Sequence, residues 1–143
     1  TRLAEKLREI QGKYDFVLID CAPSLSVVTT NAIMASDEVV IPLKIDGFAI
    51  EGLQHVNNTI DVLERGFSLP TIDRKIVITM YEGNTTMMKA FAEEVTSGVY
   101  KTKIRKAIAV GESTAQKQPM LYYDPKHEVT EDYRALAEEI AGE

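Results

Sequence analysis

The sequence is poor in the residues that build covalent or metal cross-links. It contains one cysteine, Cys21, so no disulfide can form within the chain, and we expect a reducing cytoplasm. His55 and His127 are isolated, without cysteines or acids at ligand spacing, so we predict no structural zinc site and no histidine-based triad. No apolar run approaches the roughly 18 residues of a membrane span, and no signal-peptide pattern occurs, so we expect no membrane contact.

Strong positive charge is also absent. The net charge is −6, which excludes a strongly basic nucleic-acid module but leaves room for local basic patches. The length of 143 residues, with 45% apolar and 27% charged residues, is ordinary for one globular domain over residues 1–143.

Short apolar runs alternate with segments of helical periodicity, which predicts an α/β fold with a mostly parallel sheet of about four strands. The predicted strands are Phe16–Asp20, Glu38–Pro42, Lys75–Thr79 and Val99–Ile104. The predicted last helix opens at Thr130, and residues 121–126 are predicted to be a loop.

The first of these runs carries the most functional information. Phe16 to Ile19 are four consecutive apolar residues, which is typical of a buried strand in a parallel sheet. Asp20 follows at the carboxyl end, the edge at which open α/β sheets bind ligands. An apolar strand that ends in a carboxylate is also what nucleotide hydrolases use to hold Mg²⁺.

The order of the motifs resembles the ParA/MinD branch of the deviant P-loop ATPases, and ParA-type partition proteins most closely. The matching residues are Asp20, Pro23 and Ser24; Thr30, Asn31 and Ala32; Asp37, Val39 and Pro42; and Tyr123, Asp124 and Pro125. This resemblance covers nearly the whole chain. It implies a partial P-loop NTPase-like fold of three layers, with helices on both sides of the sheet.

The phosphate-binding motif of that family, G-x-x-x-x-G-K-[ST], is absent. Gly47 and Gly52 have the glycine spacing, but Leu53 and Gln54 follow in place of lysine and serine or threonine. The expectation is therefore the C-terminal portion of a ParA-like ATPase, which alone binds no nucleotide tightly and is inactive.

The resemblance assigns roles to individual residues. Asp20 becomes the catalytic acid that reaches Mg²⁺ through a water, and Pro23 with Ser24 becomes the switch that senses the γ-phosphate. For each of these residues, the alternative is a purely structural role in an ordinary turn after a strand. The residues expected around the adenine are Thr79, Met80, Tyr81, Ile104 and Arg105, for which a plain strand end is the alternative.

DNA binding in this family relies on scattered basic residues that contact phosphates. Two family arginine positions hold Asn84 and Ala109 here. A nearby basic cluster, Lys101, Lys103 and Lys106 together with Arg105, is the candidate replacement. The alternative is a solvated charged face.

The leading hypothesis is that the chain is part of a protein that forms a homodimer with ATP and Mg²⁺ and binds DNA non-specifically. This protein would work with a ParB-like protein and partition plasmids or chromosomes at the nucleoid. One alternative is a MinD-like membrane switch, which the acidic tail, with Arg134 as its one basic residue, disfavours. The other alternative is an interaction module that has lost ATPase activity.

Overall fold

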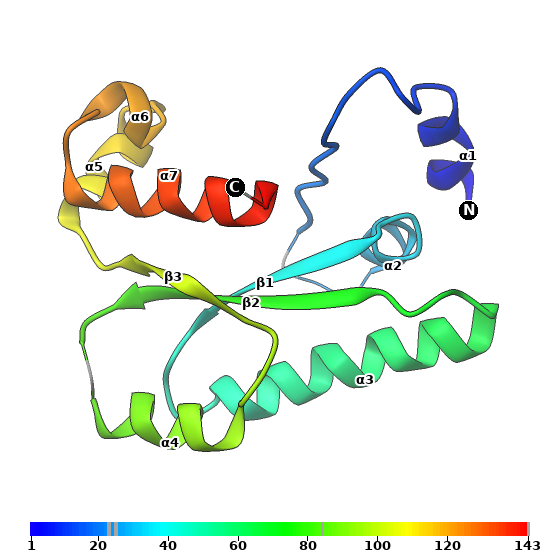
Figure 1. Ribbon diagram of the computed structural model, residues 1–143, viewed down its shortest axis with the longest axis horizontal. Helices are drawn as coiled ribbons and strands as arrows, with labels where there is room; N and C mark the ends of the chain where they lie inside the picture. The colour runs from blue at the N-terminus through cyan, green and yellow to red at the C-terminus, as the bar shows by residue number, and fades with distance from the viewer. Residues whose placement is uncertain (23, 25, 84, 143) are drawn as a thin grey trace. The chain divides into compact units, whose positions relative to one another are not determined.

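The computed structural model describes residues 1–22, 24, 26–83 and 85–142. The chain divides into two compact units. The first unit comprises Thr1–Val39 and Gln54–Asp73, and the second comprises Val40–Leu53 and Arg74–Glu143. Figure 1 shows the helices and strands of both units. The prediction of a single domain over residues 1–143 stays a prediction.

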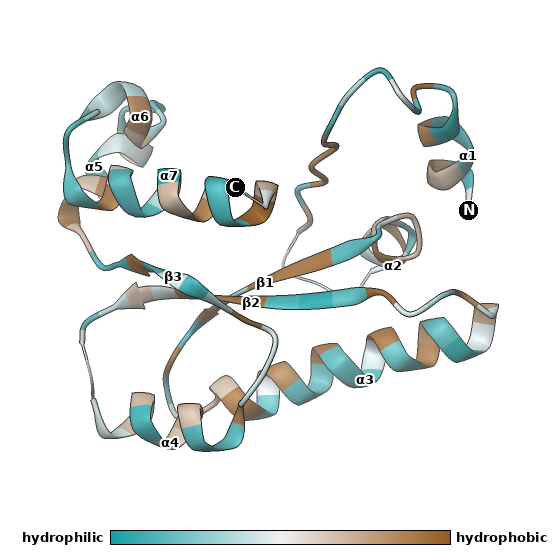
Figure 2. Cartoon of the chain, in the orientation of Figure 1, coloured by the Kyte–Doolittle hydropathy of each residue, from teal (hydrophilic) through white to brown (hydrophobic). Residues whose placement is uncertain are grey.

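The first unit is helical. It contains α1 (Arg2–Arg8), α2 (Val27–Ile33), which contacts α1, and most of α3 (Ala49–Phe67). Figure 2 shows hydrophobic and hydrophilic residues alternating along α3, the pattern of a helix with one buried stripe. The buried core of the unit consists of Ile33, Ile60, Leu63 and Ile72.

The predicted strand over Phe16–Asp20 is wrong, because the described residues 16–20 belong to no strand or helix. The side chains are also not buried: Phe16 is 59% exposed, Val17 50% and Leu18 88%. Apolar composition favours a strand only where a neighbouring strand accepts its backbone hydrogen bonds and a layer covers its side chains. Neither is provided by the part of the chain that the structure describes.

The second unit contains most of the sheet. β1 (Glu38–Lys44), β2 (Asp73–Tyr81) and β3 (Val99–Arg105) form a parallel three-stranded sheet in the order β1-β2-β3. The predicted α/β class is confirmed, with three strands described rather than about four. Along β1, Val40 is 38% exposed, whereas Ile41 is 8% exposed.

The helices that follow in the second unit are α4 (Thr86–Glu94), α5 (Ile108–Ala115), α6 (Met120–Tyr123) and α7 (Glu128–Ala141). In Figure 1, α4 and α7 lie on opposite sides of β2 and β3. A core cluster of Val77, Tyr100, Ile104, Met120 and Val129 joins the strands to α6 and α7.

The chain turns into α7 earlier than predicted. The helix begins at Glu128, and the Nδ1 of His127 accepts a hydrogen bond from the Val129 amide at 3.1 Å. Thr130 therefore lies inside the helix, where its hydroxyl donates to the carbonyl oxygen of Asp124 at 2.7 Å. The loop predicted over residues 121–126 is also wrong in its first part, which belongs to α6.

None of the described helices has the length and apolar character that a membrane crossing requires.

Candidate functional site

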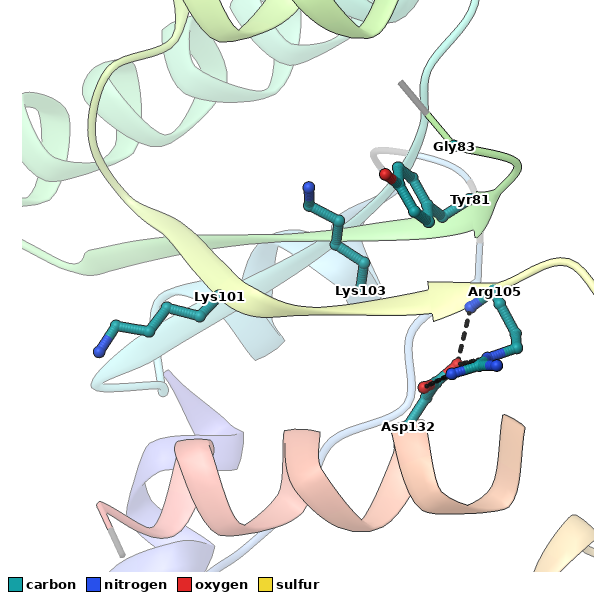
Figure 3. A pocket seen from close by; sticks show the side chains of 6 residues that line it. All are labelled: Tyr81, Gly83, Lys101, Lys103, Arg105 and Asp132. Carbon is teal, nitrogen blue, oxygen red and sulfur yellow. Dashed lines mark hydrogen bonds and ion pairs between the residues drawn. The ribbon is translucent and has the colours of Figure 1, made fainter. Parts of the chain in front are cut away.

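An open groove of about 460 Å³ lies in the second unit, beside the ends of β2 and β3. Figure 3 shows the side chains that line it. They come from β2 and the residues after it, from β3, and from α7: Tyr81, Gly83, Lys101, Lys103, Arg105 and Asp132.

The basic character of the groove comes from residues of β3 that lie between or just after its two buried positions. Tyr100 and Ile104 are buried in the core cluster, at 8% and 4% exposure. Lys101, Lys103 and Arg105 line the groove. The strand thus buries Tyr100 and Ile104, while its basic side chains reach the groove in different directions, Arg105 toward α7 and Lys103 beside Tyr81 (Figure 3).

An irregularity at Met80 shapes the groove from the β2 side. Ile78 pairs with Lys103, and the next pair is Tyr81 with Arg105. β2 therefore has one more residue than β3 between these two pairs. Met80 has a φ of +51°, which is unusual for a residue other than glycine. Such bulges redirect the side chains beside them. The ring centroid of Tyr81 lies 4.7 Å from the Lys103 ammonium, an attractive cation–π arrangement.

A second irregularity lies in β3. Ile76 pairs with Val99, and the next pair is Ile78 with Lys103, so β3 has extra residues between these two pairs. Within this stretch, the carboxylate of Glu139 on α7 accepts hydrogen bonds from two consecutive amides, those of Lys101 at 2.7 Å and Thr102 at 2.9 Å. Partial burial opposes ionisation of Glu139, but these bonds outweigh it and lower the pKa of the carboxyl group.

Arg105 closes one end of the groove through ion pairs with α7. Its Nε and Nη2 donate to the two carboxylate oxygens of Asp132 at 2.7 and 2.9 Å, and its backbone amide donates to Asp132 at 3.1 Å. Its Nη1 donates to Glu128. Partial burial opposes ionisation of Asp132, but the bonds from Arg105 outweigh it and lower the pKa of Asp132. The hydrogen bond to Asp132 in turn raises the pKa of Arg105.

The remaining predicted residues of the second unit lie outside this lining. Lys106 donates to Glu82 at 2.9 Å, and this bond lowers the pKa of Glu82. Ile104 packs in the core cluster, so its side chain does not reach the groove. Thr79 is half-buried in β2, and Met80 is exposed. Ala109, at a family arginine position, packs against the core cluster, whereas Asn84 lies outside the described residues.

The predicted nucleotide residues Asp20 and Ser24 belong to the first unit, and Pro23 lies outside the described residues. Asp20 is exposed, and the carbonyl oxygen of Ser24 accepts a hydrogen bond from the Thr29 hydroxyl at 2.6 Å. Among the described residues, no group of three or more histidines, cysteines and acids could hold a metal ion. One exposed carboxylate and a sequence without a phosphate-binding loop do not make a complete site for ATP and Mg²⁺.

The acids of α7 are the functional candidates that the sequence analysis missed. Glu128 and Asp132 are four residues apart, and Glu139 follows seven residues later, so the three acids recur at helical spacing. That spacing is the signal that could have identified them as one face directed at a basic strand.

Residues 1–72, half of the chain, match a protein family described as an AAA domain (AAA_31). The chain is 34% identical over 144 residues to the sporulation initiation inhibitor protein Soj of Bacillus subtilis, an alignment that covers 98% of this chain. It is 33% identical over 144 residues to the chromosome partitioning protein ParA of Myxococcus xanthus, which covers 97% of this chain. The chain belongs to the ParA family of partition ATPases.

This ParA-family chain spans about half the length of the curated relatives it matches, 57% of Soj and 50% of the Myxococcus ParA. The crystal structure of a plasmid partition protein from Borrelia burgdorferi superimposes with a TM-score of 0.54 at 27% identity. That match covers 68% of this chain and 41% of the Borrelia chain, and it agrees with a P-loop NTPase-like α/β fold.

Proposed function

We propose that this chain is the C-terminal part of a ParA-type partition ATPase, and that its groove on β3 contacts the phosphate backbone of DNA. The observation that carries the proposal is that three basic side chains of β3, those of Lys101, Lys103 and Arg105, line one open groove. Phosphate contacts made by lysine and arginine give affinity without reading sequence.

Charge placement supports this reading against the alternative of a merely solvated face. The whole chain has a net charge of −6, yet three basic side chains line a single groove. The Tyr81 ring holds the Lys103 ammonium beside it, which orders a cation that would otherwise sample many rotamers.

The finer functions are proposed for the full-length protein. ATP bound with Mg²⁺, for which Asp20 supplies one carboxylate, drives formation of a homodimer and thereby controls DNA binding. A ParB-like protein stimulates hydrolysis, and the protein acts in the cytoplasm at the nucleoid to partition plasmids or chromosomes.

The test is the salt dependence of binding to a labelled DNA duplex of scrambled sequence, followed by fluorescence anisotropy. Each lost phosphate contact lowers the slope of log K against log salt concentration by about one, so Lys101→Gln with Lys103→Gln should lower it by about two. Lys89→Gln, at an exposed position of α4 outside the groove, is the charge-matched control and should behave like the wild type. A slope that the double variant leaves unchanged would refute the DNA contact.

A further inference from the structure

Two carboxylates of α7 already bind Arg105. Asp132 meets the Arg105 guanidinium with both carboxylate oxygens, at 2.7 and 2.9 Å, in the two-pronged arrangement that arginine also makes with phosphate. Glu128 binds the same guanidinium through Nη1. Figure 3 shows Arg105 directed toward Asp132 on α7, while Lys101 and Lys103 point elsewhere.

The two carboxylates play different parts. Asp132 is 13% exposed and also accepts the backbone amide of Arg105, so it helps to attach α7 to β3. Glu128 is 78% exposed and reaches the guanidinium from solvent. An ion pair this exposed adds little to stability, because water screens it and two long side chains must be ordered.

We propose that Glu128 and Asp132 compete with the DNA phosphate for Arg105 and so set the affinity of the groove. This inference rests on the proposed DNA contact. A phosphate that approaches Arg105 must displace at least the Glu128 carboxylate and must overcome the repulsion of two negative charges. Lys101 and Lys103, which do not bind Glu128 or Asp132, then provide the first contacts, and Arg105 joins only where the phosphate displaces the carboxylates of α7.

The decisive variant is Glu128→Gln, which removes the charge with almost no change in size. Its matched control is Glu131→Gln, which removes the same charge from the same helix, where the side chain binds Arg134 instead. We expect Glu128→Gln to bind the scrambled duplex about 3- to 10-fold more tightly at ~0.1 M salt, because a repulsive charge next to a phosphate-binding cation is gone. Glu131→Gln should change the affinity by less than about twofold, because its carboxylate binds Arg134 and not Arg105.

A double-mutant cycle separates competition at Arg105 from a general charge effect. In an Arg105→Gln background, Glu128→Gln should lose its advantage over Glu131→Gln. Equal effects of the two glutamate variants in the wild-type background would overturn the competition while leaving the DNA proposal in place. Failure of every variant to bind the duplex, even at low salt, would overturn both proposals.

Discussion

The attachment of α7 to β3 through Glu139 is open to a direct thermodynamic test. The Glu139 carboxylate accepts the consecutive amides of Lys101 and Thr102, at 2.7 and 2.9 Å, where the register of β3 shifts. Replacement by alanine removes both acceptors at once. The helix then keeps its apolar contacts, through Val129, Leu136 and Ile140, but loses its polar link to the strand.

The magnitude follows from the exposure of the two amides. A hydrogen bond to a charged acceptor contributes about 1.5–3 kcal/mol where both partners are well buried. Lys101 is exposed and Thr102 is half-buried, so released amides regain water, and we assign each bond about 1 kcal/mol. Glu139→Ala should therefore lower the free energy of unfolding by about 2 kcal/mol, and Glu139→Gln, which keeps one acceptor, by about 1 kcal/mol.

The assay is urea-induced unfolding followed by circular dichroism at pH 7, with Glu138→Ala as control because that residue is exposed in the same turn. A surface change of that kind should cost no more than about 0.5 kcal/mol.

The pH dependence of stability gives a second test. The pKa of Glu139 is lowered in the folded protein, so its contribution to the free energy of unfolding is present above the ordinary glutamate pKa of about 4.3 and is lost as the pH falls through the folded pKa. The difference in stability between the wild type and Glu139→Ala should therefore narrow as the pH falls through that lowered value. Equal losses for Glu139→Ala and Glu138→Ala at pH 7 would show that the carboxylate does not hold the strand.

Three further variants test other parts of the structure. Ile60→Ala removes a side chain with 0% exposure from the first unit and should cost about 3–4 kcal/mol in urea unfolding, and a loss below ~1 kcal/mol would mean that this core is not closed. Met80→Gly relieves a positive φ of +51° and should raise the stability by up to about 1 kcal/mol, whereas a lower stability would show that the methionine side chain outweighs the backbone strain. Asp20→Ala in the full-length protein should abolish Mg²⁺-dependent ATP turnover without changing the circular dichroism spectrum, and normal turnover in a phosphate-release assay would remove Asp20 from the proposed metal site.

The sequence was a good guide to elements whose signals are local. Short apolar runs predicted β1, β2 and β3, because these strands find their partners within the described chain. The run Phe16–Ile19 has an equally strong apolar signal but forms no strand among the described residues. The apolar composition of a segment shows how strongly burial would stabilise it. Whether a neighbouring strand or helix is there to bury it depends on the rest of the fold.

The candidate site was predictable only on one side. The basic cluster on β3 was evident from the sequence, but the acids of α7 that accept hydrogen bonds from this strand lie 23 to 38 residues away in the chain. The helical spacing of these acids marks a shared face, but which strand that face binds depends on how α7 packs. The placement of Lys106 beside Glu82, away from the groove lining, is likewise a consequence of where β3 ends.

The contacts between α7 and β3 also bear on how this sheet avoids aggregation. An outer strand normally offers a row of backbone donors to any extended peptide nearby. At β3, the amides of Lys101, Thr102 and Arg105 are already bound by carboxylates of α7, so an incoming strand must first detach the helix. At the opposite edge, β1 contains Pro42, which has no amide hydrogen to donate. Among the described strands, the contacts of α7 at β3 and the proline in β1 thus both reduce the backbone donors available to a strand of a second molecule.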